Sequence, residues 1–209
     1  MIQLENVTFT YNGSEEKGNL KNINLSIRQG EVILLCGESG CGKTTLTRLI
    51  NGLIPWYYEG ELNGIIKVDG KEIREQPLHI LSRKIGSVFQ NPRSQFFNVD
   101  TTSEIAFSCE NQGLPEDEIR ERIHQTVSLF QIENLIDRNI FHLSGGEKQK
   151  IACASVSAGE PEIFVLDEPS SNLDVAAIED LKHIISCWKS AGKTVIIAEP
   201  RLYYLMELA

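Results

Sequence analysis

Residues 37–45 read Gly37-Glu38-Ser39-Gly40-Cys41-Gly42-Lys43-Thr44-Thr45, and this stretch decides the fold of the chain. It fits the pattern G-x-x-x-x-G-K-[ST], in which backbone N–H groups surround a phosphate. Glycine permits the left-handed backbone and the close approach that such a loop requires. The Lys43 ammonium can reach β- and γ-phosphates, and the Thr44 hydroxyl can bind Mg²⁺. The pattern therefore predicts a nucleoside triphosphate site.

The flanking residues supply the setting that this loop needs. Glu31 to Cys36 form a mostly apolar run of strand length, and Thr45 to Ile50 continue as a helix. A strand, a glycine loop and a helix in this order direct the positive helix N-terminus at the bound anion. The alternative, an ordinary glycine-rich turn, does not require this setting.

The rest of the pattern predicts an α/β fold that begins with an antiparallel unit. The first two strands alternate apolar and polar residues, as half-buried strands do, whereas the later runs at 31–36, 162–166 and 194–198 are mostly apolar. Residues 102–158 show helical spacing without strand runs, which indicates a helical lobe inserted between sheet strands. The predicted strands are 2–9, 22–27, 31–36, 65–70, 84–89, 162–166 and 194–198, with a helix from about Asp174 to Gly192.

Composition bounds the compartment and the partners of the chain. The 209 residues, 41% of them hydrophobic, suffice for one domain, and no apolar run is long enough to cross a bilayer. Residues 1–5 fit a strand rather than a leader, and the five scattered cysteines suit reduced cytosolic thiols. The net charge of −9, without a block of Lys or Arg, argues against nucleic acid as a partner. We therefore expect a cytoplasmic chain that contacts a membrane only through another protein.

A second motif, Leu-Ser-Gly-Gly-Glu at 143–147, lies between the phosphate loop and an acidic strand end. Ser144 can N-cap the helix that follows, and Gly145 and Gly146 leave backbone N–H groups uncovered at its positive end. The acidic strand end is Asp167-Glu168. With these three motifs in this order, the chain resembles the ABC-transporter ATPase family, whose signature is of the LSGGQ type.

The resemblance covers essentially the whole chain and implies its architecture. It implies a P-loop NTPase (RecA-like) parallel core with an N-terminal antiparallel β subdomain and an inserted α-helical subdomain. Residues 1–90 and 160–209 would form the nucleotide-binding core, and residues from about 91 to 159 the helical signature subdomain, within one domain, 1–209. Family members continue with further strands and a closing helix, so we expect a truncated C-terminus.

The resemblance also assigns roles to individual residues. Glu168 matches the catalytic glutamate that polarises the attacking water, and Gln90 matches a glutamine that contacts this water or Mg²⁺. Thr44, Gln90 and Asp167 would together hold Mg²⁺. Tyr11 falls where the family has an aromatic ring that stacks on adenine, although a tyrosine packed at a strand end is the alternative. The expected ATP contacts in the same chain are Tyr11, Gly37, Glu38, Ser39, Gly40, Cys41, Gly42, Lys43, Thr44 and Thr45.

In this family ATP lies between two protomers that are arranged head to tail. The partner would be a second copy of this chain or a related ATPase subunit. Closure of the dimer would act through the helical subdomain and Gln90 on an integral membrane subunit, which places the chain peripherally on the cytoplasmic face of the membrane. The residues expected to contact ATP in trans are Ser144, Gly145, Gly146, Glu147 and Asp174.

One segment points to a branch of the family. Residues 90–97 read Gln-Asn-Pro-Arg-Ser-Gln-Phe-Phe and resemble a stretch of energy-coupling factor importers, which take up vitamins or transition-metal ions. Phe96 and Phe97 line a groove for a membrane partner in one interpretation and pack inside the helical lobe in the other. We therefore expect an ATPase that powers such an importer. ABC-type ATPases that act on ribosomes or DNA usually carry tandem domains or basic arms, which this sequence lacks.

Pro200 departs from the family pattern. The family has a histidine in a context such as Glu-His-Arg-Leu, whereas this chain reads Glu199-Pro200-Arg201-Leu202. The proline side chain can neither donate nor accept a hydrogen bond, so it cannot contact a γ-phosphate or a water molecule as imidazole can. Proline at this position has three interpretations: a degenerate site, a site that depends on Glu168 alone for hydrolysis, or an altered sequence. We expect nucleotide binding with slowed hydrolysis, and a catalytically impaired regulatory subunit is the alternative function.

Overall fold

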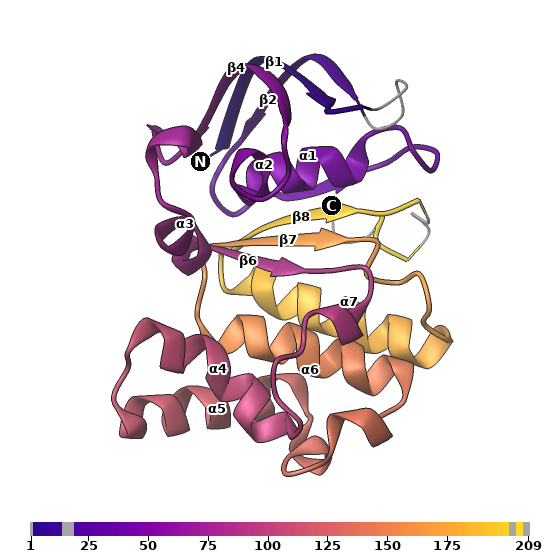
Figure 1. Cartoon of the computed structure of the whole chain (residues 1–209). Helices are drawn as coiled ribbons and strands as arrows, with labels where there is room; N and C mark the ends of the chain where they lie inside the picture. The colour runs from indigo at the N-terminus through magenta and orange to yellow at the C-terminus, as the bar shows by residue number, and fades with distance from the viewer. Residues whose placement is uncertain (1, 14–18, 201–203, 207–209) are drawn as a thin grey trace.

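A computed structural model describes residues 2–13, 19–200 and 204–206. The chain forms an antiparallel sheet, a parallel sheet and a layer of helices, which are stacked in that order (Figure 1). The predicted α/β class is therefore confirmed, including its antiparallel unit, parallel core and inserted helices. None of the helices in these described ranges is both long and apolar enough to cross a membrane.

The antiparallel sheet is built around the first strand of the chain. Its order is β2-β1-β4-β5, with β1 Ile2–Tyr11, β2 Leu20–Ile27, β4 Gly60–Val68 and β5 Lys71–Glu72. The strand predicted at 65–70 begins earlier, at Gly60, because residues 60–63, which are mostly not apolar, pair with residues 8–11 at the end of β1. Asn6, at φ 51°, forms a bulge opposite Gly64, where a Cβ would lie 2.6 Å from the Asn6 carbonyl oxygen.

The parallel sheet has the order β3-β8-β7-β6, with β3 Val32–Leu35, β6 Ile85–Val88, β7 Ile163–Asp167 and β8 Thr194–Ala198. All three strand pairs are parallel, and β8 is buried along its whole length. The carboxyl ends of the four strands therefore lie at one edge of the sheet, which is where open α/β sheets bind ligands. The loops that follow these strands carry the phosphate loop, Gln90, Glu168 and Pro200.

Helices cover both faces of the parallel sheet (Figure 1). On the side of the antiparallel sheet lie α1 Lys43–Ile50, α2 Leu53–Trp56 and α3 Leu78–Lys84. On the other side lie α4 Thr101–Gln112, α5 Glu116–Phe130, α6 Gly145–Ala158 and α7 Val175–Ser190. Short 3₁₀ turns occupy Ile73–Glu75, Pro92–Ser94, Glu133–Leu135 and Ile140–His142. The sequence did not predict α3, because seven residues are too few to establish a helical period.

Alternate residues of β7 join two hydrophobic cores. Ile163 and Val165 pack with α1 and the antiparallel sheet, whereas Phe164 and Leu166 pack with the lower helices. The Trp188 indole of α7 stacks on Phe164 with ring centroids 4.0 Å apart, and its N–H donates to the α6 hydroxyl of Ser157 at 2.7 Å. Each large apolar side chain buried in this way contributes about 1.5–3 kcal/mol of transfer free energy. The sheet is thereby fixed to the layers on both sides.

Candidate nucleotide site

The phosphate loop connects β3 to α1 at the carboxyl edge of the parallel sheet. Its backbone requires glycine, because Gly37, Gly40 and Gly42 have φ of 150°, 83° and 100°. A Cβ at Gly37 would lie 2.7 Å from the Cys41 sulfur, and one at Gly42 would lie 2.7 Å from a Leu20 methyl group. Among the described residues, no side chain caps the N-terminus of α1. The first N–H groups of this helix can therefore bind an anion.

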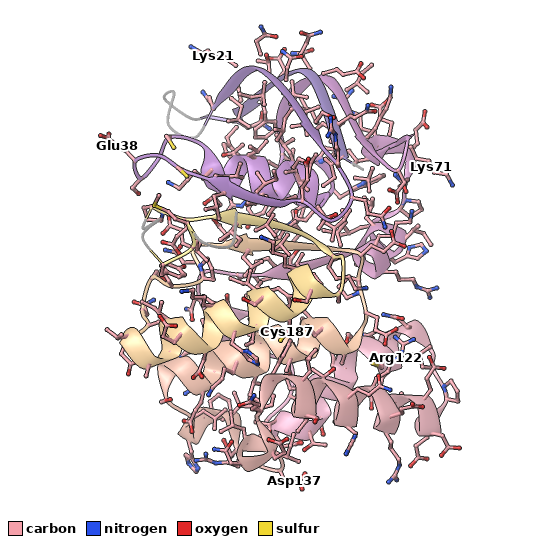
Figure 2. The ribbon with its side chains drawn as sticks, turned by 180° about the vertical axis from the view of Figure 1, so that it is seen from behind. Lys21, Glu38, Lys71, Arg122, Asp137 and Cys187 are labelled. Carbon is pink, nitrogen blue, oxygen red and sulfur yellow. The ribbon has the colours of Figure 1, made fainter. Side chains whose placement is uncertain are left out.

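Lys43 lies inside the loop. It is buried, and its ammonium donates to the carbonyl oxygens of Gly37 at 2.8 Å and Glu38 at 2.9 Å. The Glu38 side chain, in contrast, points away from the chain at the outer tip of the loop (Figure 2). A buried cation whose partners in the described residues are two neutral carbonyl groups and, at 3.9 Å, the Cys41 sulfur favours an anionic ligand. The positive charge is thus held where the phosphate pattern predicts it.

Thr44 and Asp167 meet next to the loop. Thr44 is on the first turn of α1 and Asp167 ends β7, and the Thr44 hydroxyl donates to Asp167 Oδ1 at 2.9 Å. Burial raises the pKa of the Asp167 carboxyl, and the charge of Glu168 raises it further, although the bond from Thr44 opposes both effects. A hydroxyl and a desolvated carboxylate are hard oxygen ligands of the kind that Mg²⁺ prefers. These two residues therefore fit a Mg²⁺ site.

Gln90 and Glu168 form a second pair. They follow β6 and β7, which are neighbouring strands, and Gln90 Nε2 donates to Glu168 Oε2 at 2.9 Å. Glu168 has a φ of 43°, which is unusual for a residue with a side chain, and its N–H donates to the Ala198 carbonyl at 2.7 Å. A cavity of about 610 Å³ is lined by Thr44, Gln90 and Asp167, among other residues. The structure thus brings together the three side chains predicted to hold Mg²⁺.

Tyr11 lies beside α1, at the end of β1. Its hydroxyl accepts from the Arg48 guanidinium at 3.1 Å and lies 3.3 Å from the Thr45 hydroxyl. Its ring packs edge-on against Phe9, with centroids 4.8 Å apart. These contacts belong to a packed tyrosine, and stacking on adenine stays a prediction. No sequence signal pointed to Arg48, which also lies over the Tyr58 ring at 4.0 Å, because a single arginine on a helix has no distinctive spacing.

The helix start at Ser144 is a capping box. The Glu147 N–H donates to the Ser144 hydroxyl at 3.2 Å, and the Ser144 N–H donates to the Glu147 carboxylate at 2.7 Å. This bond from the Ser144 backbone is the main reason why the pKa of Glu147 lies below its usual value, and an ion pair with Arg138 at 3.1 Å lowers it further. The predicted N-cap is confirmed. Glu147 is engaged in stabilising the helix start, and its contact with ATP in trans stays a prediction.

The signature residues lie apart from the phosphate loop within one chain. Ser144, Gly145, Gly146, Glu147 and Asp174 line a cavity of about 310 Å³, which does not include the side chains around Thr44. Asp174 also N-caps α7, because its carboxylate accepts from the Ala177 N–H at 2.8 Å. In Figure 1, α1 lies on one face of the parallel sheet and α6 on the other. Each chain therefore presents two candidate half-sites, and Gln90 of the first and Gly145 of the second also line a common cavity of about 350 Å³.

The residues after β8 and after Gln90 answer two questions left open by the sequence. Pro200 is exposed, and Glu199 is buried and hydrogen-bonded to Ser170, so it does not offer a substitute for the missing imidazole. Arg201 lies outside the described residues.

Phe96 packs against the lower core, whereas Phe97 is 75% exposed. Phe96 therefore fits the interpretation of a side chain packed inside the helical lobe, and Phe97 fits that of a side chain available to a partner.

Comparison with known proteins gives matches over the whole chain. Residues 20–171 match the ABC transporter family. A protein of Treponema denticola described as an ABC transporter ATP-binding protein is 56% identical over 209 residues, which are 100% of this chain and 42% of that protein. A protein of Pyrococcus horikoshii with the same description is 41% identical over 210 residues, which are 100% of this chain and 74% of that protein. The chain thus spans about two-fifths of the Treponema relative.

Solved structures show the same fold. The structure of CbiO1 from Clostridium perfringens, part of the ABC transporter complex CbiONQ, matches with a TM-score of 0.84 and 32% identity, over 96% of this chain and 78% of that chain. The dimeric ATP-binding cassette MJ0796, in a post-hydrolysis state with ADP and Pi, matches with a TM-score of 0.83 and 27% identity, over 98% and 90% of the two chains.

Proposed function

The chain belongs to the ABC transporter family, and on this premise we propose that it binds and hydrolyses ATP to power an importer. The observation that carries this proposal is the grouping at the carboxyl edge of the parallel sheet. There the Lys43 ammonium, the Thr44–Asp167 pair and the Gln90–Glu168 pair converge from three different loops. Charge neutralisation, metal ligands and a carboxylate for water are the components that phosphoryl transfer needs.

Each of these residues has a part in the proposed reaction. The N–H groups of the loop and the Lys43 ammonium bind the phosphates of ATP. Thr44, Gln90 and Asp167 would hold Mg²⁺, which would offset the charge of the phosphates. Glu168 accepts a proton from the attacking water, and the Gln90 amide orients the Glu168 carboxylate through the 2.9 Å hydrogen bond. Adenine would stack on Tyr11.

Two protomers complete the site in this proposal. The Ser144 helix start and Asp174 lie in a different cavity from Thr44, so they reach the ATP of a second ATPase subunit rather than their own. The exposed N–H groups at Gly145 and Gly146 would face the γ-phosphate from the opposite side. The dimeric structural neighbour supports a pair of ATPase subunits. The pair would be arranged head to tail and would consist of two copies of this chain or of this chain and a relative.

The membrane partner would bind next to Phe97. This ring stacks on Phe107 with centroids 4.7 Å apart, and both line a cavity of about 290 Å³ with Leu53, Leu78 and Phe89. Phe97 is exposed and the other four side chains are partly buried, and an exposed aromatic ring beside an apolar groove of this kind marks a protein contact site. The likeness to CbiO1 and the segment 90–97 support an energy-coupling factor importer for vitamins or transition-metal ions. The chain would then be cytoplasmic and peripheral on the inner membrane face.

Pro200 favours a second candidate, a catalytically impaired subunit that regulates an active partner. The ring is exposed directly after β8, and Glu199 turns towards Ser170. In this candidate ATP still binds at the phosphate loop, while hydrolysis takes place mainly at the site that the partner completes. A non-transport ABC ATPase remains the third class, and no contact in the described residues favours it.

Calorimetric titration with ATP tests the proposed binding. We expect saturable binding that requires Mg²⁺, and we expect Lys43→Ala to abolish it while Glu168→Gln retains it. Absence of Mg²⁺-dependent binding in folded wild-type protein would refute the proposal. Steady-state hydrolysis then separates the two candidates, because Pro200→His should increase turnover if only the missing imidazole limits the site.

Co-purification tests the membrane partner. The tagged chain, expressed in its own cell and extracted in mild detergent, should carry an integral membrane protein with it. Phe97→Ala should weaken this association. Leu129→Ala, which alters an exposed apolar side chain elsewhere, on α5, should not. Equal effects of the two substitutions would argue against the groove beside Phe97.

A further inference from the structure

The carboxylate of Glu199 is buried at the end of β8 and accepts three hydrogen bonds on one oxygen. Glu199 is 1% exposed. Its Oε2 accepts from the Ser170 hydroxyl at 2.7 Å, from the Ser170 N–H at 3.3 Å and from the Tyr204 hydroxyl at 2.9 Å. A buried carboxylate is expensive unless donors satisfy it, and hydrogen bonds to a charged acceptor are stronger than neutral ones. This cluster therefore fixes the relative positions of the segments that it joins.

These segments carry the reaction machinery of the proposed site. Ser170 lies two residues after Glu168, in the loop that ends at Asp174, the N-cap of α7. The Glu199 N–H donates to the Leu35 carbonyl at 3.1 Å, at the end of the strand that leads into the phosphate loop. The carbonyl oxygen of Ala198, the residue before Glu199, accepts from the Glu168 N–H at 2.7 Å. The end of β8 thus holds the Glu168 loop at two points and the start of the phosphate loop at a third.

We propose that Glu199 is a positioning residue that keeps the loop from Glu168 to Asp174 in its reactive arrangement. The proposal rests on the proposed ATPase function. Glu168 has a φ of 43°, and a residue with a side chain keeps such a backbone conformation only when its surroundings fix it. Ser170, anchored by Glu199, provides that restraint two residues after Glu168. Glu199 therefore acts through the loop, without touching the nucleotide.

Glu199→Gln tests the inference with little change of shape. The amide keeps one oxygen that can accept at the place of Oε2, but the negative charge is lost, so the bonds from Ser170 and Tyr204 become weaker, neutral ones. We expect kcat for ATP hydrolysis, per bound nucleotide, to fall at least tenfold while KM changes less than twofold. Ser170→Ala should act in the same direction, and the double variant should fall no further than the more damaged single one, because both substitutions act on the hydrogen bond from the Ser170 hydroxyl to Glu199. Glu162→Gln, an exposed glutamate before β7, is the matched control.

Amide hydrogen exchange gives a second measurement that does not depend on turnover. In Glu199→Gln, exchange should accelerate at least tenfold within 168–174, while the phosphate loop helix α1 and the control variant keep wild-type rates. Unchanged kcat would overturn the inference, as would a fall in kcat matched by the same loss of nucleotide binding. If wild-type turnover lies below detection, unchanged exchange in 168–174 overturns it. If wild-type protein does not bind ATP, the proposed function fails, and exchange still decides whether Glu199 restrains the loop.

Discussion

Thr44→Val isolates the hydroxyl that joins α1 to β7. Valine has nearly the shape of threonine, so the substitution removes the donor to Asp167 Oδ1 and leaves the packing of the helix in place. In the nucleotide-free protein, Asp167 then loses the bond that opposes the effect of burial, and the pKa of its carboxyl rises further. In the presence of Mg²⁺, the same substitution deletes one proposed metal ligand.

The size of the effect follows from the contact. A hydrogen bond to a charged group contributes about 1.5–3 kcal/mol, and the lower half of this range applies because Asp167 is only partly buried. A chain of this length shifts its Tm by about 2–4 °C per kcal/mol, so we expect a Tm lower by about 3–9 °C at pH 7. The Mg²⁺-dependent gain in ATP affinity should also fall at least tenfold, which is about 1.4 kcal/mol.

Scanning calorimetry and ATP titration with and without Mg²⁺ measure both quantities, and Thr44→Ser, which keeps the hydroxyl, is the control. The Tm difference between wild type and Thr44→Val should shrink as the pH falls, because the bond from Thr44 favours the ionised Asp167 carboxylate. The reasoning would be wrong if Thr44→Val kept the full Mg²⁺ effect, or if Thr44→Ser lost as much as the valine variant.

Three further predictions concern the start of α6. Gly146→Ala should lower the free energy of unfolding, measured in urea, by about 1–3 kcal/mol, because the new Cβ would lie 2.6 Å from the Ala177 Cβ. The control, Gly145→Ala, should change it by no more than about 0.5 kcal/mol, because the nearest atom to its Cβ lies at 3.7 Å. Equal effects of the two substitutions would contradict this. Ser144→Ala should cost about 1 kcal/mol through the lost cap, and Ser144→Thr should recover most of it by the same assay. Since the pKa of Glu147 is lowered from about 4.5, the stability that its carboxylate contributes is present above that pH and is lost as the pH falls through the folded pKa. In an acid titration followed by circular dichroism, the stabilities of wild type and Glu147→Gln should therefore converge as the pH falls. A stability difference that stays constant with pH would contradict this.

Local motifs were the part of the site that the sequence could predict. The phosphate loop, the acidic end of β7 and the Ser144 cap depend on residue types at fixed short spacing, and the structure has the predicted strand–loop–helix order around them. The hydrogen bonds of Thr44 with Asp167 and of Gln90 with Glu168 join distant parts of the chain. Their proximity was expected only from the family resemblance.

Features that depend on tertiary pairing were missed. The start of β4 at Gly60 is polar and becomes a strand only because β1 offers it an edge. Glu199 reads as one more charged residue next to an unusual proline, and only the fold shows that it accepts from Ser170 and Tyr204. Arg48 likewise acquires its contact with Tyr11 from the packing of α1 on the antiparallel sheet. Short-range spacing carries no record of such contacts.

The stack of Trp188 on Phe164 equips the chain with an optical reporter. One face of the indole contacts β7, the strand that ends in Asp167, and its N–H is bonded to Ser157 on α6, the helix that starts at the signature. The chain has two tryptophans, and the other, Trp56, is 51% exposed, so Trp56→Phe leaves a single buried emitter. Any sliding of α6 along the sheet during a nucleotide cycle would alter the environment of this indole and shift its fluorescence, without a label.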